Sequence, residues 1–162
     1  MRSYSVVMLA ALLICFSGCG GADRPKLVKV TGQVTLNGEP LSGAAVMLQR
    51  DPPDPQYRRP SRGMTDLSGN FTGSTYGEGD GIPPGKYKVA ITKLEVPEEY
   101  NSEGPEENQP PVKYITPFIY SDPERSGLTV EITSKGITPA VIELEGQPEL
   151  VRSRAQRRAD DP

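Results

Sequence analysis

The chain has 162 residues, a formal net charge of −3, and neither histidine nor tryptophan. Without histidine it has no Ser-His-Asp or Cys-His catalytic arrangement, no imidazole acid–base group and no histidine-based zinc or non-haem iron site. Its mildly acidic balance argues against nucleic acid as a partner, since binding to phosphates needs a basic surface. We therefore expect a protein that is not an enzyme and that uses no metal or cofactor.

Residues 1–18 have the composition of a secretory signal peptide, expected to be a helix that is cleaved. Arg2 precedes the apolar run Val6–Ile14, which is too short to span a bilayer, since about 20 apolar residues are needed. The stretch Phe16-Ser17-Gly18-Cys19 resembles the lipobox of bacterial lipoproteins. That resemblance implies that Cys19 becomes the first residue, with diacylglycerol on its sulfur and an acyl chain such as palmitate on its amine. The alternative is an ordinary signal peptide in which Cys19 is incidental.

Cleavage before Cys19 would also set the chemistry of the exported chain. Cys15 would leave with the signal and Cys19 would carry lipid, so no disulfide or thiol site would remain. Residues 19–26 would form a short tether. Gly20 rather than Asp after the cysteine resembles lipoproteins sent to the outer membrane, so we expect a lipid-anchored cell-envelope protein, on the outer rather than the inner membrane.

Alternating apolar and polar residues predict the first strands of a folded domain over residues 27–146. In Leu27–Leu36 the inward positions are Val28, Val30, Val34 and Leu36. Asn37-Gly38 then supplies a tight turn. A second strand follows at Ala44–Leu48, with Ala44, Val46 and Leu48 on one face.

The middle of the chain alternates prolines, glycines and short strands. Residues 50–62 contain Pro52, Pro53, Pro55 and Pro60 and predict a loop. Gly63–Thr65 and Asn70–Thr72 predict a hairpin whose turn places Gly69 in the left-handed conformation. After the glycine-rich loop Tyr76–Gly85, the stretch Lys86–Thr92 predicts a strand that turns Tyr87, Val89 and Ile91 inward.

The last part of the domain is predicted to hold a loop and two strands. Residues 95–113 are acidic and proline-rich, which indicates a long mobile loop. Leu128–Ile132 and Ala140–Leu144 predict two strands paired through Lys135-Gly136, and residues 147–162 are expected to be a disordered tail. About seven short strands with short links predict an all-β, antiparallel two-sheet sandwich.

Three motifs together resemble the carboxypeptidase regulatory-like domain, a transthyretin-like (prealbumin-like) β-sandwich found in exported bacterial proteins. They are Thr31–Val46 (TGQVTLNGEPLSGAAV), Thr65–Phe71 (TDLSGNF) and Pro84–Val89 (PGKYKV). The resemblance covers Lys29 to Leu144 and implies a non-catalytic module for adhesion, assembly or ligand binding. Residues 95–113 depart from the shorter links of that family.

Two other functions stay open. The transthyretin-like hydrolase of purine breakdown shares the sandwich, but its site needs histidine and a terminal Tyr-Arg-Gly-Ser motif, and neither occurs here. A carbohydrate-binding module could stack sugars on loop tyrosines, although such residues also serve as packing lids; the candidates are Tyr57, Tyr76, Tyr100, Tyr114 and Tyr120. No ligand-binding residue is predicted, and the expected partner is an envelope protein or polysaccharide.

Two short motifs resemble ligand loops but favour ordinary turns. Gly77-x-Gly79-x-Gly81 precedes a strand rather than a helix, and its Glu78 and Asp80 would repel phosphate. Asp66-x-Ser68-x-Asn70 spaces oxygen atoms as calcium loops do, yet lacks the downstream bidentate carboxylate.

The predicted loops matter through their placement, because recognition concentrates on loops held by a rigid scaffold. If residues 50–62, 76–85 and 95–113 meet at one end of the sandwich, they form a mixed-charge surface with tyrosines. If they split between the two ends, we expect only a weak or transient contact.

Overall fold

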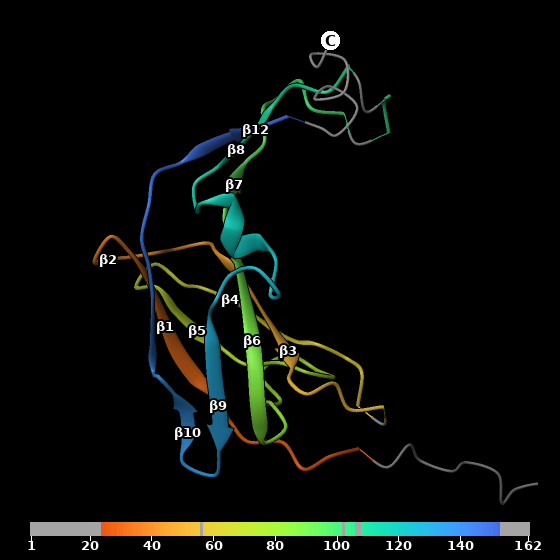
Figure 1. The fold of residues 1–162 in the computed structure, drawn as a ribbon, viewed down its shortest axis with the longest axis vertical. Coiled ribbons are helices and arrows are strands. Elements are labelled where there is room, and N and C mark those ends of the chain that lie inside the picture. The colour runs from red at the N-terminus through yellow and green to blue at the C-terminus, as the bar shows by residue number, and fades with distance from the viewer. Residues whose placement is uncertain (1–23, 56, 102, 106–107, 153–162) are drawn as a thin grey trace, which may run out of the picture.

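The computed structural model describes residues 24–152, except residues 56, 102 and 106–107, and the regular secondary structure of these residues is almost entirely β-strand (Figure 1). The predicted signal peptide, Cys19 and residues 153–162 lie outside the described residues. No helix in the described part is long and apolar enough to cross a membrane.

Two sheets form the sandwich. The larger has the order β10-β9-β6-β3-β4, and the other contains β11, β1 and β2, with β5 also paired to β1. The strands of the larger sheet are β10 (Gly136–Thr138), β9 (Thr129–Thr133), β6 (Gly85–Thr92), β3 (Ala45–Arg50) and β4 (Ser61–Met64). Those of the second are β11 (Val141–Leu144), β1 (Thr31–Leu36), β2 (Glu39–Pro40) and β5 (Asn70–Thr72).

One hydrophobic core lies between these sheets, and the predicted inward faces of the strands are confirmed. The fully buried side chains include Val30, Val34, Val46, Leu48, Val89, Ile91, Ile132 and Leu144. Residues from both sheets belong to a single cluster, so the all-β sandwich prediction is confirmed. Among the described residues, every buried member of this cluster lies between Val30 and Leu144.

The predicted turns are confirmed by their backbone angles. Asn37 and Gly38 have φ values of 52° and 86° and join β1 to β2, as a tight hairpin turn requires. Gly69 has a φ of 75°, and its amide donates to the Asp66 carbonyl at 3.0 Å.

The predicted hairpin across this second turn is wrong in its pairing. β4 pairs with β3 and β5 pairs with β1, so the two strands belong to different sheets. The reason lies in Phe71, whose buried ring occupies the space that a Cβ would fill at Gly32 and at Gly63. The two sheets meet around this ring, and an isolated bridge joins Arg62 of β4 to Ser74, which lies two residues beyond β5.

The predicted pairing of the last two sandwich strands is also wrong. β9 pairs instead with β10, a strand that was not predicted, and β11 crosses to the other sheet. There it runs parallel to β1, so the sandwich is not wholly antiparallel. β11 cannot pair with β9, because β9 already has β10 on one edge and β6 on the other. On the second sheet, β11 buries Ile142 and Leu144 in the core.

A third, small sheet stands apart from the sandwich at its upper end (Figure 1). We call it the distal sheet; its order is β12-β8-β7, with β7 at Leu94–Glu95, β8 at Val112–Tyr114 and β12 at Glu149–Val151. β12 lies in the predicted disordered tail, so that prediction is wrong for these residues. Pairing with β8 gives the strand hydrogen-bond partners that its local sequence does not reveal.

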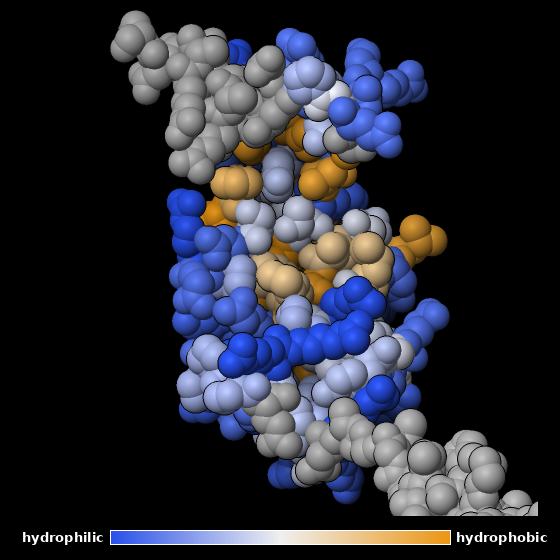
Figure 2. All heavy atoms as spheres, turned by 90° about the vertical axis from the view of Figure 1, so that its right-hand side faces the viewer, coloured by the Kyte–Doolittle hydropathy of each residue, from blue (hydrophilic) through white to orange (hydrophobic). Residues whose placement is uncertain are grey.

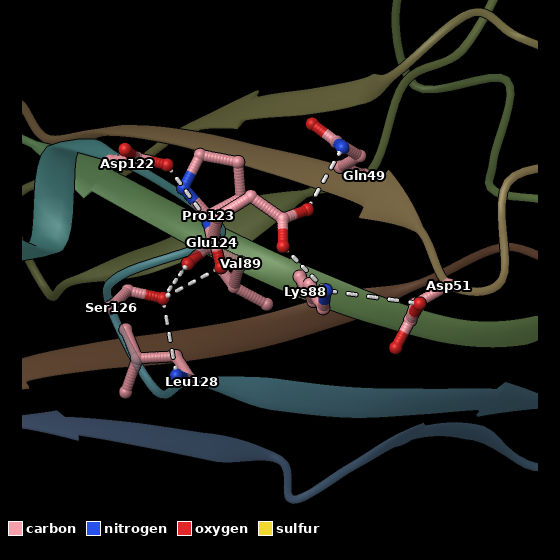
Figure 3. Close-up of polar contacts among 9 residues, drawn as sticks. All are labelled: Gln49, Asp51, Lys88, Val89, Asp122, Pro123, Glu124, Ser126 and Leu128. Atoms are coloured by element: carbon pink, nitrogen blue, oxygen red, sulfur yellow. Dashed lines mark hydrogen bonds and ion pairs between the residues drawn. The ribbon is translucent and has the colours of Figure 1, made fainter.

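The segment between β8 and β9 packs on β6. It contains the short 3₁₀ helix η3 (Phe118–Ser121), and the loop after it lies along β6 (Figure 3). Ser126 Oγ donates to the Val89 carbonyl at 2.6 Å and accepts from the Leu128 amide at 3.1 Å. Nearby, Glu124 accepts a 2.6 Å hydrogen bond from Lys88 Nζ, which raises the pKa of Lys88.

Candidate functional site

The three predicted loops split between the two ends of the sandwich. Residues 50–62 and 76–85 lie at the end where the chain enters, and the guanidinium carbon of Arg59 is 6.0 Å from the centre of the Tyr76 ring. Residues 95–113 lie at the opposite end, between β7 and β8 (Figure 1). The protein therefore has two separate loop surfaces rather than one.

At the entry end, the loop Ser74–Gly81 is organised by the carboxylate of Asp80. Asp80 Oδ1 accepts from the Thr75 amide at 2.8 Å, while Oδ2 accepts from the amides of Tyr76 at 3.0 Å and Gly77 at 2.8 Å. Burial opposes ionisation of Asp80, but these backbone donors outweigh it and hold its pKa below the ordinary value. The amides that could have bound a phosphate thus bind the protein's own carboxylate.

Four basic side chains from distant parts of the chain surround this loop, and we call them the basic end: Arg24, Lys29, Arg59 and Arg62. The guanidinium carbon of Arg24 is 4.8 Å from the centre of the Tyr76 ring, within cation–π range. Lys29 Nζ donates to the Gly79 carbonyl. These contacts bring the entering chain against the loop.

A groove of about 840 Å³ runs from this loop along the side of the sandwich, between β4 and β5. Its lining combines polar and apolar surface and includes Arg62, Met64, Asn70, Tyr76 and Glu78. The groove is open to solvent along its length.

At the opposite end, the distal sheet presents apolar side chains next to acidic ones. The exposed fractions of Leu94, Val96 and Leu150 are 40%, 51% and 73%. Lys113 Nζ lies 3.0 Å from Glu95 Oε2, and this exposed pair spans β7 and β8. On the face that Figure 2 shows, apolar side chains lie at middle and upper height, below hydrophilic ones at the tip, whereas the lower part is mostly hydrophilic.

The loop that joins β7 to β8 is tied together by one side chain. Gln109 is 8% exposed; its Oε1 accepts from the Asn101 amide at 2.8 Å, and its Nε2 donates to the Asn101 and Pro105 carbonyls. The sequence predicts a long mobile loop here. In its described residues, the hydrogen bonds of the buried Gln109 side chain join Asn101 and Pro105.

The loop tyrosines serve mainly in packing. Arg24 covers one face of the Tyr76 ring, and Tyr114 meets Phe118 edge-on with 5.0 Å between ring centroids. The Tyr120 hydroxyl lies 3.3 Å from the Glu145 carbonyl and amide, and Tyr57 is partly buried. Tyr100 is 39% exposed and lies in the loop between β7 and β8, whereas Tyr76 lies at the entry end, so the five tyrosines are not gathered on one surface.

The motif with calcium-like spacing is a closed turn. Asp66 Oδ1 accepts from the amides of Ser68 at 2.8 Å and Asn70 at 2.9 Å. Within residues 24–152, leaving aside the undescribed positions, no three Asp, Glu, His or Cys side chains gather as a metal cluster. The Asp66 carboxylate therefore serves the turn between β4 and β5.

Sequence reasoning missed the basic end because its members are far apart in the chain. The only local signals are the density of Lys and Arg in residues 24–29 and 58–62 and the density of Glu in residues 95–103. These charges form two separate surfaces only because the fold places the first two segments together and the third at the other end.

Comparisons with known proteins give no relative. No family model matches the chain, and no curated protein or solved structure is significantly similar to it. The fold and the two ends define the class of protein here: a β-sandwich with a basic entry end and an acidic, partly apolar distal end.

Proposed function

We propose that this protein is a lipid-anchored, non-catalytic binding module of the bacterial cell envelope, held at Cys19 and recognising a partner through its distal sheet. The observation that carries the proposal is the placement of the two ends. The described chain leads from Arg24 into β1 at one end of the sandwich, and the distal sheet stands at the other (Figure 1). An anchor at Cys19 then presents the distal sheet away from the membrane.

The proposal includes membership of the carboxypeptidase regulatory-like, transthyretin-like class and a place on the outer membrane. Support comes from the sandwich itself and from the turns at Asn37-Gly38 and Gly69, which lie within two of the three motifs that carry the resemblance. The short apolar run and the lipobox-like Cys19 support the anchor.

The anchor is tested by mass spectrometry and membrane fractionation of the full chain. We expect the wild type to carry diacylglycerol and to sediment with membranes, and a Cys19→Ala variant to lack the added mass. Treatment with a globomycin-type inhibitor of lipoprotein processing should leave the signal peptide attached. An unmodified wild type found in the soluble fraction would overturn the anchor.

Recognition is tested by pull-down from envelope extract with paired surface variants. Val96→Asp with Leu150→Asp changes the distal sheet, and Leu67→Asp is the control, because Leu67 is 92% exposed on the β4–β5 turn. All three side chains are exposed, so we expect all variants to melt close to the wild type. Loss of a specific partner, protein or polysaccharide, only in the distal variant supports the proposal, and identical partner lists contradict it.

The contact is expected to be modest in affinity. Only one of the two loop surfaces faces away from the anchor, and its described apolar side chains are few. A weak or transient interaction fits a small recognition surface of this kind.

A further inference from the structure

We propose that the basic end is a docking surface for anionic lipid headgroups and holds the sandwich upright on the membrane. This proposal rests on the anchor at Cys19 for its biological setting, but the basic end can be tested without any lipid on the protein.

The charge is divided between the two ends of the sandwich. Arg24, Lys29, Arg59 and Arg62 surround one loop, and the exposed Arg58 and Lys26 lie beside members of this set in the chain. The distal end instead carries the exposed acids Glu95, Glu98, Glu99 and Glu103. Lys113 and Arg152 also lie at the distal end, but the acids outnumber them, so the described residues carry opposite net charge at the two ends.

Two acidic residues belong to the same loop as the basic end. The Asp80 carboxylate is engaged by three backbone amides within the loop, which leaves Glu78 as the exposed acid of this turn. The loop of residues 50–62 at the same end adds Asp51, 3.9 Å from Lys88 Nζ, and Asp54, 3.8 Å from Arg50 Nε. The six basic side chains named above outnumber these four acids, so an anionic surface is attracted to this end.

The entry end is also within reach of the membrane. The chain from Cys19 to Arg24 spans at most about 18 Å when fully extended. Arg24 is itself held against Tyr76, so the tether leaves the sandwich beside the basic side chains. An anionic leaflet attracts Lys and Arg only within about a Debye length, roughly 8–10 Å, and a tether of this length permits that approach.

The test measures sedimentation of the unlipidated chain from Gly20 with vesicles. This chain contains every described residue of the core, and its thermal melting is recorded first to show that it folds. One vesicle preparation is phosphatidylcholine alone and the other is phosphatidylcholine mixed with phosphatidylglycerol. We expect binding to the anionic vesicles that weakens as salt is raised. Equal binding to both preparations, or no binding to the anionic one, overturns the proposal.

A matched pair of triple variants locates the surface. Arg24→Gln, Arg59→Gln and Arg62→Gln change the basic end, and Lys93→Gln, Lys113→Gln and Arg125→Gln remove the same charge elsewhere. Each basic residue at an anionic surface contributes about fivefold, so the first variant should bind about 100-fold more weakly. The second should bind as the wild type does or somewhat more weakly. Equal losses in the two variants would mean that net charge alone governs binding, and would contradict a defined surface.

The two proposals can fail separately. If the chain binds anionic vesicles but carries no lipid in cells, the docking surface is supported and the anchor is contradicted. If the chain is lipidated but its soluble form does not bind the vesicles, the anchor is supported and the docking surface is contradicted.

Discussion

The phenol of Tyr87 donates a 2.7 Å hydrogen bond to the carbonyl of Pro83, four residues earlier in the chain. Tyr87 is 3% exposed and Pro83 is buried as well. The bond fixes the turn at Pro83-Pro84-Gly85 to the strand that it precedes, β6, which is the central strand of the larger sheet. One side chain thus sets both the core packing and the course of the entry-end loop.

Tyr87→Phe should lower the free energy of unfolding by about 1–2 kcal/mol, because it keeps the ring but leaves the buried Pro83 carbonyl without its donor. The measurement is urea unfolding at neutral pH. Tyr120→Phe is the control, since its hydroxyl makes only 3.3 Å contacts at a more exposed position. Equal losses in the two variants would show that the Pro83 bond has no special weight.

The same residue should make the protein sensitive to alkali. Burial raises the pKa of Tyr87 above its ordinary value of 10.0, although the Arg50 guanidinium opposes the shift. In the unfolded chain the phenol ionises near 10.0, so the contribution of Tyr87 to stability is complete below that pH and is lost as the pH rises toward the folded pKa. Unfolding free energies measured across this range should fall less steeply for Tyr87→Phe than for the wild type. If the unfolding free energies of the two proteins fall equally with pH, ionisation of Tyr87 is not the cause of the loss.

Asp80 should make the stability of the protein sensitive to acid rather than to alkali. Burial disfavours its charge, but the amides of Thr75, Gly77 and Tyr76 prevail and lower its pKa below 3.8. Its contribution is therefore present above pH 3.8 and is lost as the pH falls through the folded pKa. Asp80→Asn should destabilise the protein by about 1–2 kcal/mol at neutral pH, with the difference shrinking in acid. Glu78→Gln, an exposed change in the same loop, should stay within about 0.5 kcal/mol.

Gly69 and Gly38 offer a matched test of close packing at positive φ. Their φ values are 75° and 86°, but a Cβ at Gly69 would lie 2.6 Å from the Val34 carbonyl oxygen, whereas nothing lies within 4 Å at Gly38. Gly38→Ala should cost about 1 kcal/mol for the left-handed backbone alone. Gly69→Ala should cost more than about 2 kcal/mol, because strand β1 must also move. Thermal melts of the two variants give the comparison, and similar values would contradict the close approach.

The faces of the strands could be predicted from sequence because alternation is a local property. Val34, Val130 and Ile132 are buried, and each has a polar residue on both sides in the sequence, so no knowledge of the partner strand is needed. Turns were predictable for the same reason, as Gly69 shows. The pairing of strands was harder to predict, because it depends on residues that are distant in the chain.

Three elements show how distant contacts overrode the local pattern. β5 pairs with β1 because Phe71 fits against Gly32, and β11 joins β1 because both sides of β9 are taken. β12 is a strand because β8 lies beside it, although its own residues are mostly exposed. The basic end has the same origin, since Arg24, Arg59 and Tyr76 meet only in the folded protein.

The parallel ladder between β1 and β11 has a mechanical consequence. The chain enters β1 from one end of the sandwich and leaves β11 toward the distal sheet at the other (Figure 1). A pull between a membrane anchor and a partner on the distal sheet therefore acts along both strands, in opposite directions. The hydrogen bonds from Gln33–Val141 to Leu36–Leu144 would then be loaded in shear, together, instead of being peeled open one after another.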